Sequence, residues 1–270
     1  MIVSQHAAAR VEQVDSEYLR ARLGALARLS GNPYGAVVLQ VADAYGFLVR
    51  ALPNPLFNHV AGLTAGSAVH LAELADWYDG HGRPLRVDVT PAQASPELLA
   101  ALTAQGLSQT GFYAGLYTEA RSGQEPGEDS AIRLDMADPE EFARVYVQGF
   151  GFPAQRQDGM AASMQVMAGR TDTSFYRARI GAQTAGVGLL FLSGRVGYLA
   201  TAATLPEYRG RGVQTALIRY RLHAAGEAGC DLVAGHAAAG SGSQRTMERC
   251  GLRLAYTKAI WSTPASRIPR

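Results

Sequence analysis

The sequence predicts an α/β (α+β) protein with two tandem halves, each a mixed, mostly antiparallel sheet flanked by helices. The expected elements follow the same order in both halves: a helix, three strands, a helix, a strand, a helix and a strand. Between the halves, residues 121–130 combine Gly, Pro, Ser and charged residues without apolar periodicity, which is typical of a linker. We therefore expect one domain at residues 1–120 and a second at residues 131–270.

The first half shows both helical and alternating apolar spacing. The signals are clearest for the third helix, because Ser95 is a good N-cap, Pro96 suits the first helical position and Gly106 suits the end. The last strand is expected to be irregular around Gly111. The expected helices are residues 16–29, 65–78 and 95–105, and the expected strands are residues 36–41, 45–50, 56–63, 85–89 and 107–118.

The second half repeats this plan after one additional strand and with one additional helix, and it has a three-strand meander at its centre. Gly181-Ala182 and Ser193-Gly194 supply the two turns of the meander. Ser241 and Gln244 have the spacing of a capping box, and Gly251 ends that helix. The expected helices are residues 139–147, 158–168, 212–228 and a last one that starts at 241 or 243 and ends at 250. The expected strands are residues 131–134, 174–180, 183–192, 195–204, 231–236 and 252–261.

The amino-acid composition argues against several classes of protein. Hydrophobic residues make up 47% of the 270 residues and charged residues 18%, so the chain can bury a core. The net charge of +2 is too small to suggest nucleic acid as the main partner. Cys230 and Cys250 have no metal-ligand or disulfide spacing, which fits a reducing cytoplasm. Residues 1–10 resemble no signal segment, and the longest apolar stretch, residues 185–192, is far too short for a membrane span.

The most informative segment is PEYRGRGVQTAL at residues 206–217, between an expected strand and an expected helix. Gly210 and Gly212 allow close approach of the backbone, while Arg209 and Arg211 add positive charge. A turn of this kind aims backbone N–H groups and a helix N-terminus at one point, which suits a phosphate.

Residues 131–262 resemble the GCN5-related N-acetyltransferase (GNAT) superfamily, in which this loop holds the pyrophosphate of coenzyme A. The family pattern is Arg or Gln, two residues, Gly, one residue, then Gly or Ala. Arg209 and Gly212 match it, whereas Gln214 stands where the small residue belongs. SGSQRTMERCGL, at residues 241–252, resembles the helix beside the pantetheine arm. The first half resembles a degenerate copy, as in tandem acetyltransferases, with GLTAG and no arginine at residues 62–66.

The resemblance implies acetyl-CoA as co-substrate and no metal. It implies that backbone N–H groups of the loop take the pyrophosphate, and that the end of the preceding strand lies along the pantetheine and polarises the thioester carbonyl. The expected cofactor-binding residues are Ala202, Ala203, Thr204, Arg209, Gly210, Arg211, Gly212, Val213, Gln214, Thr215 and Ser243.

The proton-transfer residues depart from the family pattern. Tyr198 stands where many members have a glutamate, and Met247 where many have a tyrosine that protonates the leaving thiolate. The candidate catalytic residues are therefore Tyr198, His236 and Tyr256, each of which could instead only pack in its strand. Ser243 is expected to cap its helix, with donation to the thiolate as the alternative.

The favoured function is an N-acetyltransferase that moves an acetyl group from acetyl-CoA directly to an amine of a small molecule or peptide. A catalytically weak acyl-CoA sensor or scaffold, and a pure interaction module, remain open alternatives. Tyr146, Phe150 and Phe152 either line the acceptor site or belong to the core. The sequence names neither the acceptor nor the oligomeric state, and a homodimer is among the states it leaves open.

Overall fold

The computed structural model describes residues 4–120 and 131–263, so the expected linker lies outside the described residues. The chain divides into two compact units, each made of two segments. We call Met1–Tyr18 with Gly115–Ala255 the larger unit, and Leu19–Ala114 with Tyr256–Arg270 the smaller unit. Their limits differ from the expected halves, because the first helix of the chain crosses from one unit to the other, and so does the last strand of each half.

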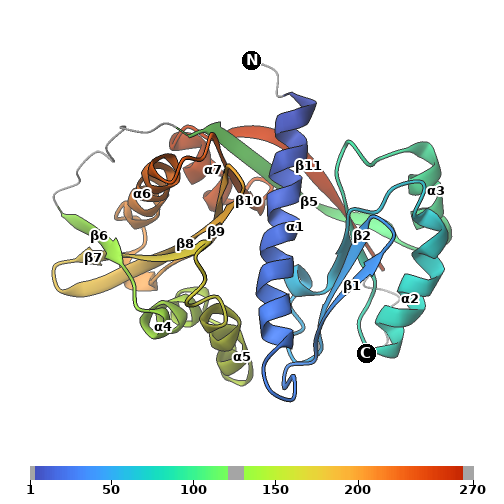
Figure 1. Cartoon of the computed structure of the whole chain (residues 1–270), viewed down its shortest axis with the longest axis horizontal. Helices are drawn as coiled ribbons and strands as arrows, with labels where there is room; N and C mark the ends of the chain where they lie inside the picture. Colours follow the sequence, from blue (N-terminus) through green and yellow to red (C-terminus); the bar gives the residue numbers. More distant parts are fainter. Residues whose placement is uncertain (1–3, 121–130, 264–270) are drawn as a thin grey trace. The chain divides into compact units, whose positions relative to one another are not determined.

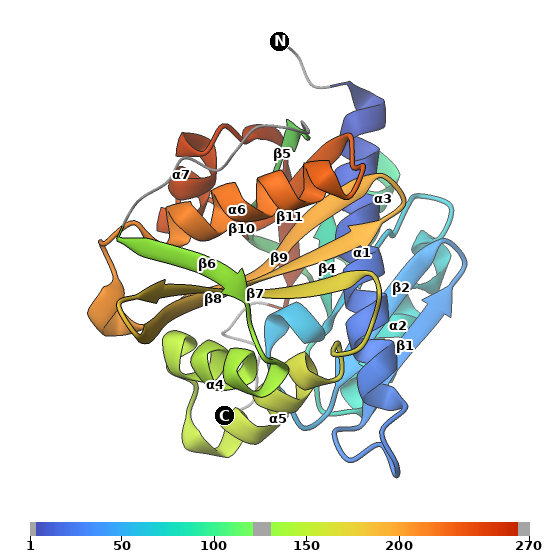
Figure 2. The ribbon, with the colours of Figure 1, turned by 60° about the vertical axis from the view of Figure 1, so that its left-hand side comes forward.

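The larger unit is a six-stranded sheet with helices on both faces (Figure 1). Its strand order is β5-β10-β9-β8-β7-β6, antiparallel from β6 to β9 and parallel between β9 and β10. Figure 2 shows α6 on one side of this sheet and α4 and α5 on the other. The elements are β5 (Ser108–Glu119), β6 (Ile132–Met136), α4 (Pro139–Phe150), α5 (Ala154–Gln165), β7 (Thr173–Ile180), β8 (Gln183–Ser193), β9 (Val196–Thr204), α6 (Val213–Glu227), β10 (Leu232–Ala238) and α7 (Gly242–Arg249).

Local signals explain most of these elements. Asp138 accepts hydrogen bonds from the N–H groups of Glu140 and Glu141, and so caps α4. The turn between β7 and β8 is Gly181-Ala182, as predicted, because Ile180 pairs with Gln183. The next turn lies one residue later than predicted, at Gly194-Arg195, where Gly194 has a positive φ of 52°.

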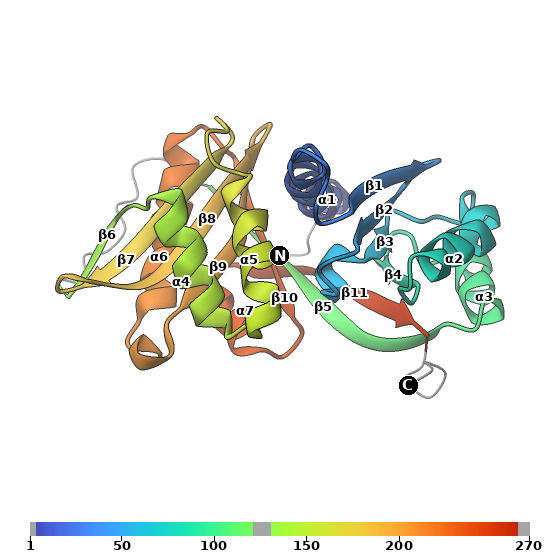
Figure 3. The ribbon, with the colours of Figure 1, turned by 90° about the horizontal axis from the view of Figure 1, so that it is seen from below.

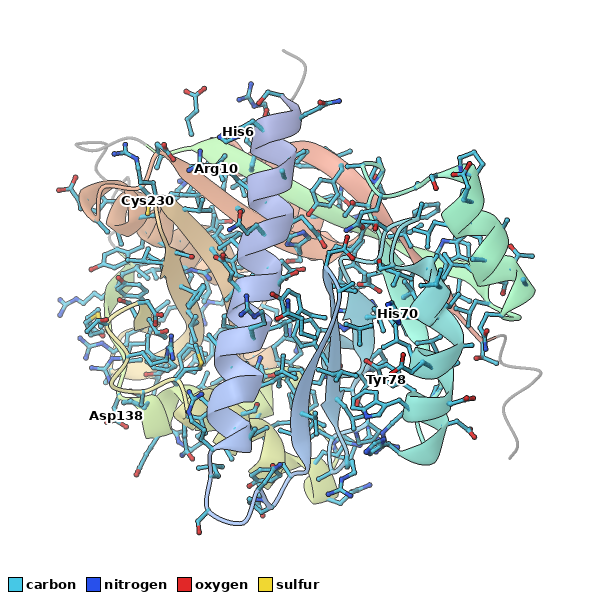
Figure 4. The ribbon with its side chains drawn as sticks, turned by 45° about the vertical axis from the view of Figure 1, so that its right-hand side comes forward. His6, Arg10, His70, Tyr78, Asp138 and Cys230 are labelled. Carbon is cyan, nitrogen blue, oxygen red and sulfur yellow. The ribbon has the colours of Figure 1, made fainter. Side chains whose placement is uncertain are left out.

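The smaller unit has the strand order β1-β2-β3-β4-β11. Its core joins these strands to α2 and α3, which Figure 3 shows on one side of them. Tyr78, labelled in Figure 4, anchors α2 by donating a 2.7 Å hydrogen bond to the carbonyl of Phe47 in β2. The elements are β1 (Ala36–Val41), β2 (Ala44–Val49), β3 (His59–Ala61), α2 (Leu71–Gly80), β4 (Arg86–Val89), α3 (Pro96–Ala104) and β11 (Arg253–Ser262).

Two expectations for this part of the chain are wrong. The strand expected at residues 56–63 is a short 3-10 turn, Pro55–Phe57, followed by β3 alone. The cause is side-chain bonding, since Asn54 accepts from the N–H of Leu56, and Asn58 bonds to Val49 and Leu52. In addition, β5 runs without a break through Gly111.

Helix α1 (Gln5–Ala27) begins well before the predicted start at residue 16. Its first part belongs to the larger unit, where Val11, Val14 and Tyr18 are buried at helical spacing. Ser4 caps the helix, because its hydroxyl accepts a hydrogen bond from the N–H of Ala7 at 3.1 Å. This cap and the burial of the apolar stripe together account for the early start. Among the described residues, no helix is long and apolar enough to cross a membrane.

The last strand of each half pairs outside its own half. In the smaller unit, β11 is antiparallel to β4, with Ala259 opposite Val89. In the larger unit, β5 lies beside β10, and the N–H of Ala120 donates to the carbonyl of Asp231 at 3.1 Å. The order of elements in the two halves is as predicted, but neither half closes its own sheet.

Candidate active site

Strands β9 and β10 run side by side only briefly before they part. Their parallel register covers Leu232–Ala234 against Val196–Tyr198, whereas β9 continues to Thr204 and β10 to Ala238. Beyond Tyr198 the two strands form a fork in the larger unit. A fork of this kind leaves one backbone edge of β9 open to an extended ligand.

A β-bulge lies in β9 just beyond the fork point. Between two successive pairs of β9 with β8, the chain advances by three residues along β9, from Leu199 to Ala202, but by only two residues along β8. The extra residue bends the strand and redirects its side chains. The bulge thus separates Tyr198, at the closed end of the fork, from Ala202–Thr204 at the open end.

The Arg- and Gly-rich loop follows β9 and leads into α6. Gly210 and Gly212 have φ values of 75° and 82°, which only glycine adopts without strain. Gly212 is the N-cap residue and has no side chain to cap the helix. The first N–H groups of α6 are therefore available to an anion, and the helix dipole favours negative charge there.

A cavity of about 770 Å³ opens between this loop and the open end of the fork. It gathers every expected cofactor-binding residue except Arg211. Its remaining lining comes from Gly149 and Phe150 at the end of α4, from Tyr208, and from Thr246 and Arg249 on α7. A helix N-terminus at one end and an open strand edge at the other fit a pyrophosphate with an extended amide arm.

The two loop arginines have different surroundings. Arg209 lines the cavity and donates a 2.7 Å hydrogen bond to the carbonyl of Gly149, which ties the loop to α4. The guanidinium of Arg211 lies 5.4 Å from the centre of the Tyr208 ring and is exposed. Arg209 is thus the better placed of the two to meet a phosphate.

Helix α7 forms the opposite wall. Ser241 caps this helix by accepting from the N–H of Gln244 at 3.2 Å, so the expectation that Ser243 is the cap is wrong. The Ser243 hydroxyl instead accepts from the Gln214 side chain at 3.2 Å, which links α7 to the start of α6. Thr246 and Arg249, missed from the sequence, follow Ser243 at helical spacing on the same face.

Tyr198 and His236 come together at the closed end of the fork. The Tyr198 hydroxyl donates to Oδ1 of Asp15 at 2.6 Å and lies 3.3 Å from Nδ1 of His236. Burial, reinforced by the Asp15 carboxylate, raises the pKa of Tyr198 well above its usual value, so this phenol stays protonated. Asp15 is not among the predicted residues, because it lies on α1, far from the motif in the sequence.

The other expected proton-transfer positions are placed differently. Tyr256 lies in β11, in a part of the strand that belongs to the smaller unit, and 8% of its surface is exposed. Met247 is buried in α7 against Gly235 of β10, where its sulfur packs as an apolar group. Neither residue lines the cavity.

Three aromatic rings cluster beside the open end of the fork. Phe150 and Phe152 stack with centroids 5.4 Å apart, and Tyr146 meets both rings edge-on. Tyr146 is buried, whereas 54% of Phe150 is exposed and this residue lines the cavity. Tyr146 thus belongs to the core, whereas Phe150 forms part of the cavity wall and offers an apolar surface to a ligand.

Other reactive or metal-ligating side chains are less suited to catalysis. Burial raises the thiol pKa of both Cys230 and Cys250, which disfavours either as a nucleophile. Glu12, Asp15 and His236 are the His and acidic side chains in the described part of the chain that lie close enough together to suggest a metal, with ligand atoms within 4.8 Å of one another.

The comparisons with known proteins agree with this geometry. Residues 140–252 match the acetyltransferase (GNAT) family. This segment of the chain belongs to that family. The matched segment contains nearly all of α4, the fork, the Arg- and Gly-rich loop and α7, and therefore every residue that lines the cavity. Acetyl transfer is the general chemistry that the match supports. Among curated proteins, no sequence matches this chain.

Solved structures share the fold over nearly the whole chain. A GCN5-related N-acetyltransferase from Kribbella flavida is 15% identical, with a TM-score of 0.63 over 91% of this chain and 96% of its own. A tandem GNAT protein from the clavulanic acid biosynthesis pathway is 14% identical, with a TM-score of 0.57 over 92% and 95% of the two chains. The chain therefore shares its mixed α/β fold with both of these proteins.

Proposed function

We propose that this protein transfers an acetyl group from acetyl-CoA directly to an amine of a small molecule or peptide. The observation that carries the proposal is one cavity that joins the uncapped start of α6 to the open edge of β9. The backbone from Gly210 to Thr215 would hold the pyrophosphate, and Ala202–Thr204 would lie along the arm and thioester. Acetyl-CoA supplies an acetyl group activated as a thioester.

The role proposed for each residue follows from its position along the fork. A backbone N–H at the open end of the fork would polarise the thioester carbonyl, a contribution of about 3–4 kcal/mol where such donors have been removed elsewhere. Tyr198 and His236 would serve proton transfer from the closed end of the fork. Tyr256 remains a weaker catalytic candidate, because it lies outside the cavity wall. Two free thiols fit a reducing, cytoplasmic location.

The runner-up is a catalytically weak acyl-CoA sensor or scaffold. It is favoured by Tyr198 and Met247, which replace the glutamate and tyrosine of the family resemblance. Turnover separates the two functions. The full chain is incubated with acetyl-CoA and a panel of primary amines, thiol release is followed, and the acetylated product is identified by mass. Amine-dependent thiol release supports the transferase. Acetyl-CoA binding without thiol release would favour the sensor.

A further inference from the structure

The β9 bulge shows in the directions of its side chains. Tyr198 and Thr201 are three residues apart, so a regular strand would point them to opposite faces of the sheet. Both instead meet α1, because Tyr198 donates to Asp15 and the Thr201 hydroxyl lies 3.1 Å from that of Tyr18. The extra residue of the bulge accounts for the shared direction. Tyr18 therefore contacts the bulge from the face that α1 covers.

Arg221 of α6 reaches the bulge from the other face. In the pairing of β8 with β9, Leu189 alone stands opposite the two bulged residues, Ala200 and Thr201. Nη1 of Arg221 donates a 3.0 Å hydrogen bond to the carbonyl of Leu189. Nε donates at 3.0 Å to the carbonyl of Leu217, one turn earlier on α6, which fixes the direction of the guanidinium. The bulge is thus held by a side chain from each face.

Gly188 makes room for this guanidinium. A Cβ at Gly188 would lie 2.9 Å from both Cζ and Nε of Arg221, so a larger residue would displace the group. Gly188 pairs with Ala202, the first residue of the open end of the fork. The arginine therefore lies behind the strand pair that carries the proposed thioester site.

The burial of Arg221 is difficult to explain by stability alone. The residue is only 1% exposed, and its hydrogen bonds go to backbone carbonyls. In the described part of the chain no carboxylate pairs with it. Burial lowers the pKa of Arg221 to about 10, so the group keeps its charge at neutral pH. A buried charge without an ion-pair partner destabilises a fold, and such exceptions are expected where function requires them.

We propose that Arg221 is a positioning residue for acetyl transfer, which together with Tyr18 fixes the β9 bulge and so aims the backbone N–H groups of Ala202–Thr204 at the thioester carbonyl. This inference rests on the proposed acetyltransferase function and deepens it, because it names what holds the oxyanion donor in place. Neither residue lines the cavity, so both act through the strand. A misplacement of about 1 Å can lower a rate about 100-fold.

The alternative is that Arg221 only joins α6 to the sheet. Its loss should then lower the stability without changing the reaction. Tyr78 supplies a matched control, because its buried hydroxyl also donates to a strand carbonyl, that of Phe47, but in the smaller unit. Tyr78→Phe thus removes a buried hydrogen bond of the same kind from a part of the chain that has no role in the proposed site.

The kinetic test uses the full chain and four variants: Arg221→Met, Arg221→Lys, Tyr18→Phe and Tyr78→Phe. The acceptors are 1,5-diaminopentane, ethanolamine, tyramine and a lysine peptide, assayed well below every melting temperature. We expect Arg221→Met to lower kcat at least about 10-fold, because the oxyanion donor is displaced. The dissociation constant of coenzyme A, measured by calorimetry, should stay within about threefold, because the start of α6 still holds the pyrophosphate.

The other variants separate positioning from packing. Arg221→Lys should recover part of the lost kcat, because an ammonium group can still donate to the carbonyl of Leu189. Tyr18→Phe removes one oxygen atom from the opposite face and should lower kcat at least about threefold. It carries the test if Arg221→Met is poorly folded. Tyr78→Phe should lower the melting temperature and leave kcat within about twofold of the parent.

A spectroscopic measurement tests the positioning without an acceptor. Acetyl-CoA isotopically labelled at the thioester carbonyl is bound to each protein, and difference infrared spectra give the carbonyl stretching frequency. A hydrogen bond to the carbonyl oxygen lowers this frequency relative to free acetyl-CoA. We expect the lowered frequency in the parent and in Tyr78→Phe, and a value closer to that of free acetyl-CoA in Arg221→Met.

Several outcomes would overturn the assignment. A parental kcat and carbonyl frequency in Arg221→Met would make this arginine a core residue only. Equal losses of kcat and of coenzyme A affinity would indicate a general distortion of the cavity. If the parent binds acetyl-CoA but acetylates no amine of the panel, the acetyltransferase proposal fails, whereas the infrared comparison still decides the role of Arg221. If the parent does not bind acetyl-CoA, both proposals fail.

Discussion

The hydroxyl of Tyr198 donates a 2.6 Å hydrogen bond to Asp15, a residue 183 positions earlier in the chain. Gly197, the neighbour of Tyr198 on β9, packs against α6, so α1 and α6 lie on opposite faces of this strand. Asp15 lies on a helix outside the matched segment, so the N-terminal segment contributes a contact to the closed end of the fork and belongs to the larger unit.

Tyr198 predicts a loss of stability at alkaline pH. Burial and Asp15 raise its pKa in the folded state, whereas an unfolded tyrosine titrates near about 10. Above that pH the unfolded chain releases a proton that the folded chain retains, so the free energy of unfolding falls as pH rises. We expect the melting temperature to fall above about pH 10, and to fall less steeply in Tyr198→Phe. Identical slopes in both proteins would contradict this.

The surroundings of Asp88, in the smaller unit, predict that its substitution by alanine strongly lowers the free energy of unfolding. Although burial alone would raise its pKa, the pKa is lowered, because His59, Arg86 and Lys258 surround the carboxylate with positive charge. Arg86 donates two hydrogen bonds to it, at 2.8 and 3.1 Å. Asp88→Ala should cost about 3–5 kcal/mol, because it leaves the buried Arg86 guanidinium without this carboxylate partner. Urea unfolding measures this cost.

The control for Asp88 is a second pair with the same sequence spacing. Arg170 and Asp172 form the same contact, but each side chain is 31% exposed. Asp172→Ala should cost no more than about 1 kcal/mol, because water screens the charges. Similar costs for the two substitutions would show that burial does not determine the strength of these pairs.

Gly197 fixes the distance between β9 and α6. A Cβ at this position would lie 2.7 Å from the Cβ of Ala225, so Gly197→Ala should push α6 from the sheet and cost about 1–3 kcal/mol. Ala225→Gly removes the clashing atom. In the Ala225→Gly background, the cost of Gly197→Ala should largely disappear. Chemical unfolding of the four proteins tests this, and additive costs would refute the proposed contact.

Phe150 predicts an effect on activity without one on stability. It is 54% exposed and lines the cavity, so Phe150→Ala should lower kcat/KM for the best amine while changing the melting temperature little. The control is Phe142 on the same helix, which is fully buried against Phe175. Phe142→Ala should cost about 3–5 kcal/mol. A strongly destabilised Phe150→Ala variant would instead place that ring in the core.

The sequence was most informative where structure depends on local chemistry. Ser95 and Ser241 cap their helices as expected, and Gly181-Ala182 forms the predicted turn. The expected cofactor residues also meet around one cavity, apart from Arg211. These features depend on residues close in the chain, where caps, turns and a strand–loop–helix motif leave clear patterns.

The remaining features depend on distant partners. The pairing of β11 with β4 joins Ala259 to Val89, far apart in the chain, and strand patterns do not encode such a partner. The contact of Asp15 with Tyr198 likewise joins two distant segments. Local periodicity reveals neither pairing. The early start of α1 is different, because Ser4 caps it and Val11 and Val14 stand at helical spacing, so local signals for it were present.

The central claim is that acetyl-CoA binds at the start of α6, and calorimetric titration of acetyl-CoA tests it most directly. Gly212→Asp places a negative charge at the N-cap. Gly229→Asp introduces the same residue just beyond the other end of α6, at a similar positive φ of 78°. We predict binding by the parent and Gly229→Asp, and binding at least about tenfold weaker, or about 1.4 kcal/mol, in Gly212→Asp. No binding by the parent, or equal binding by both variants, would contradict the claim.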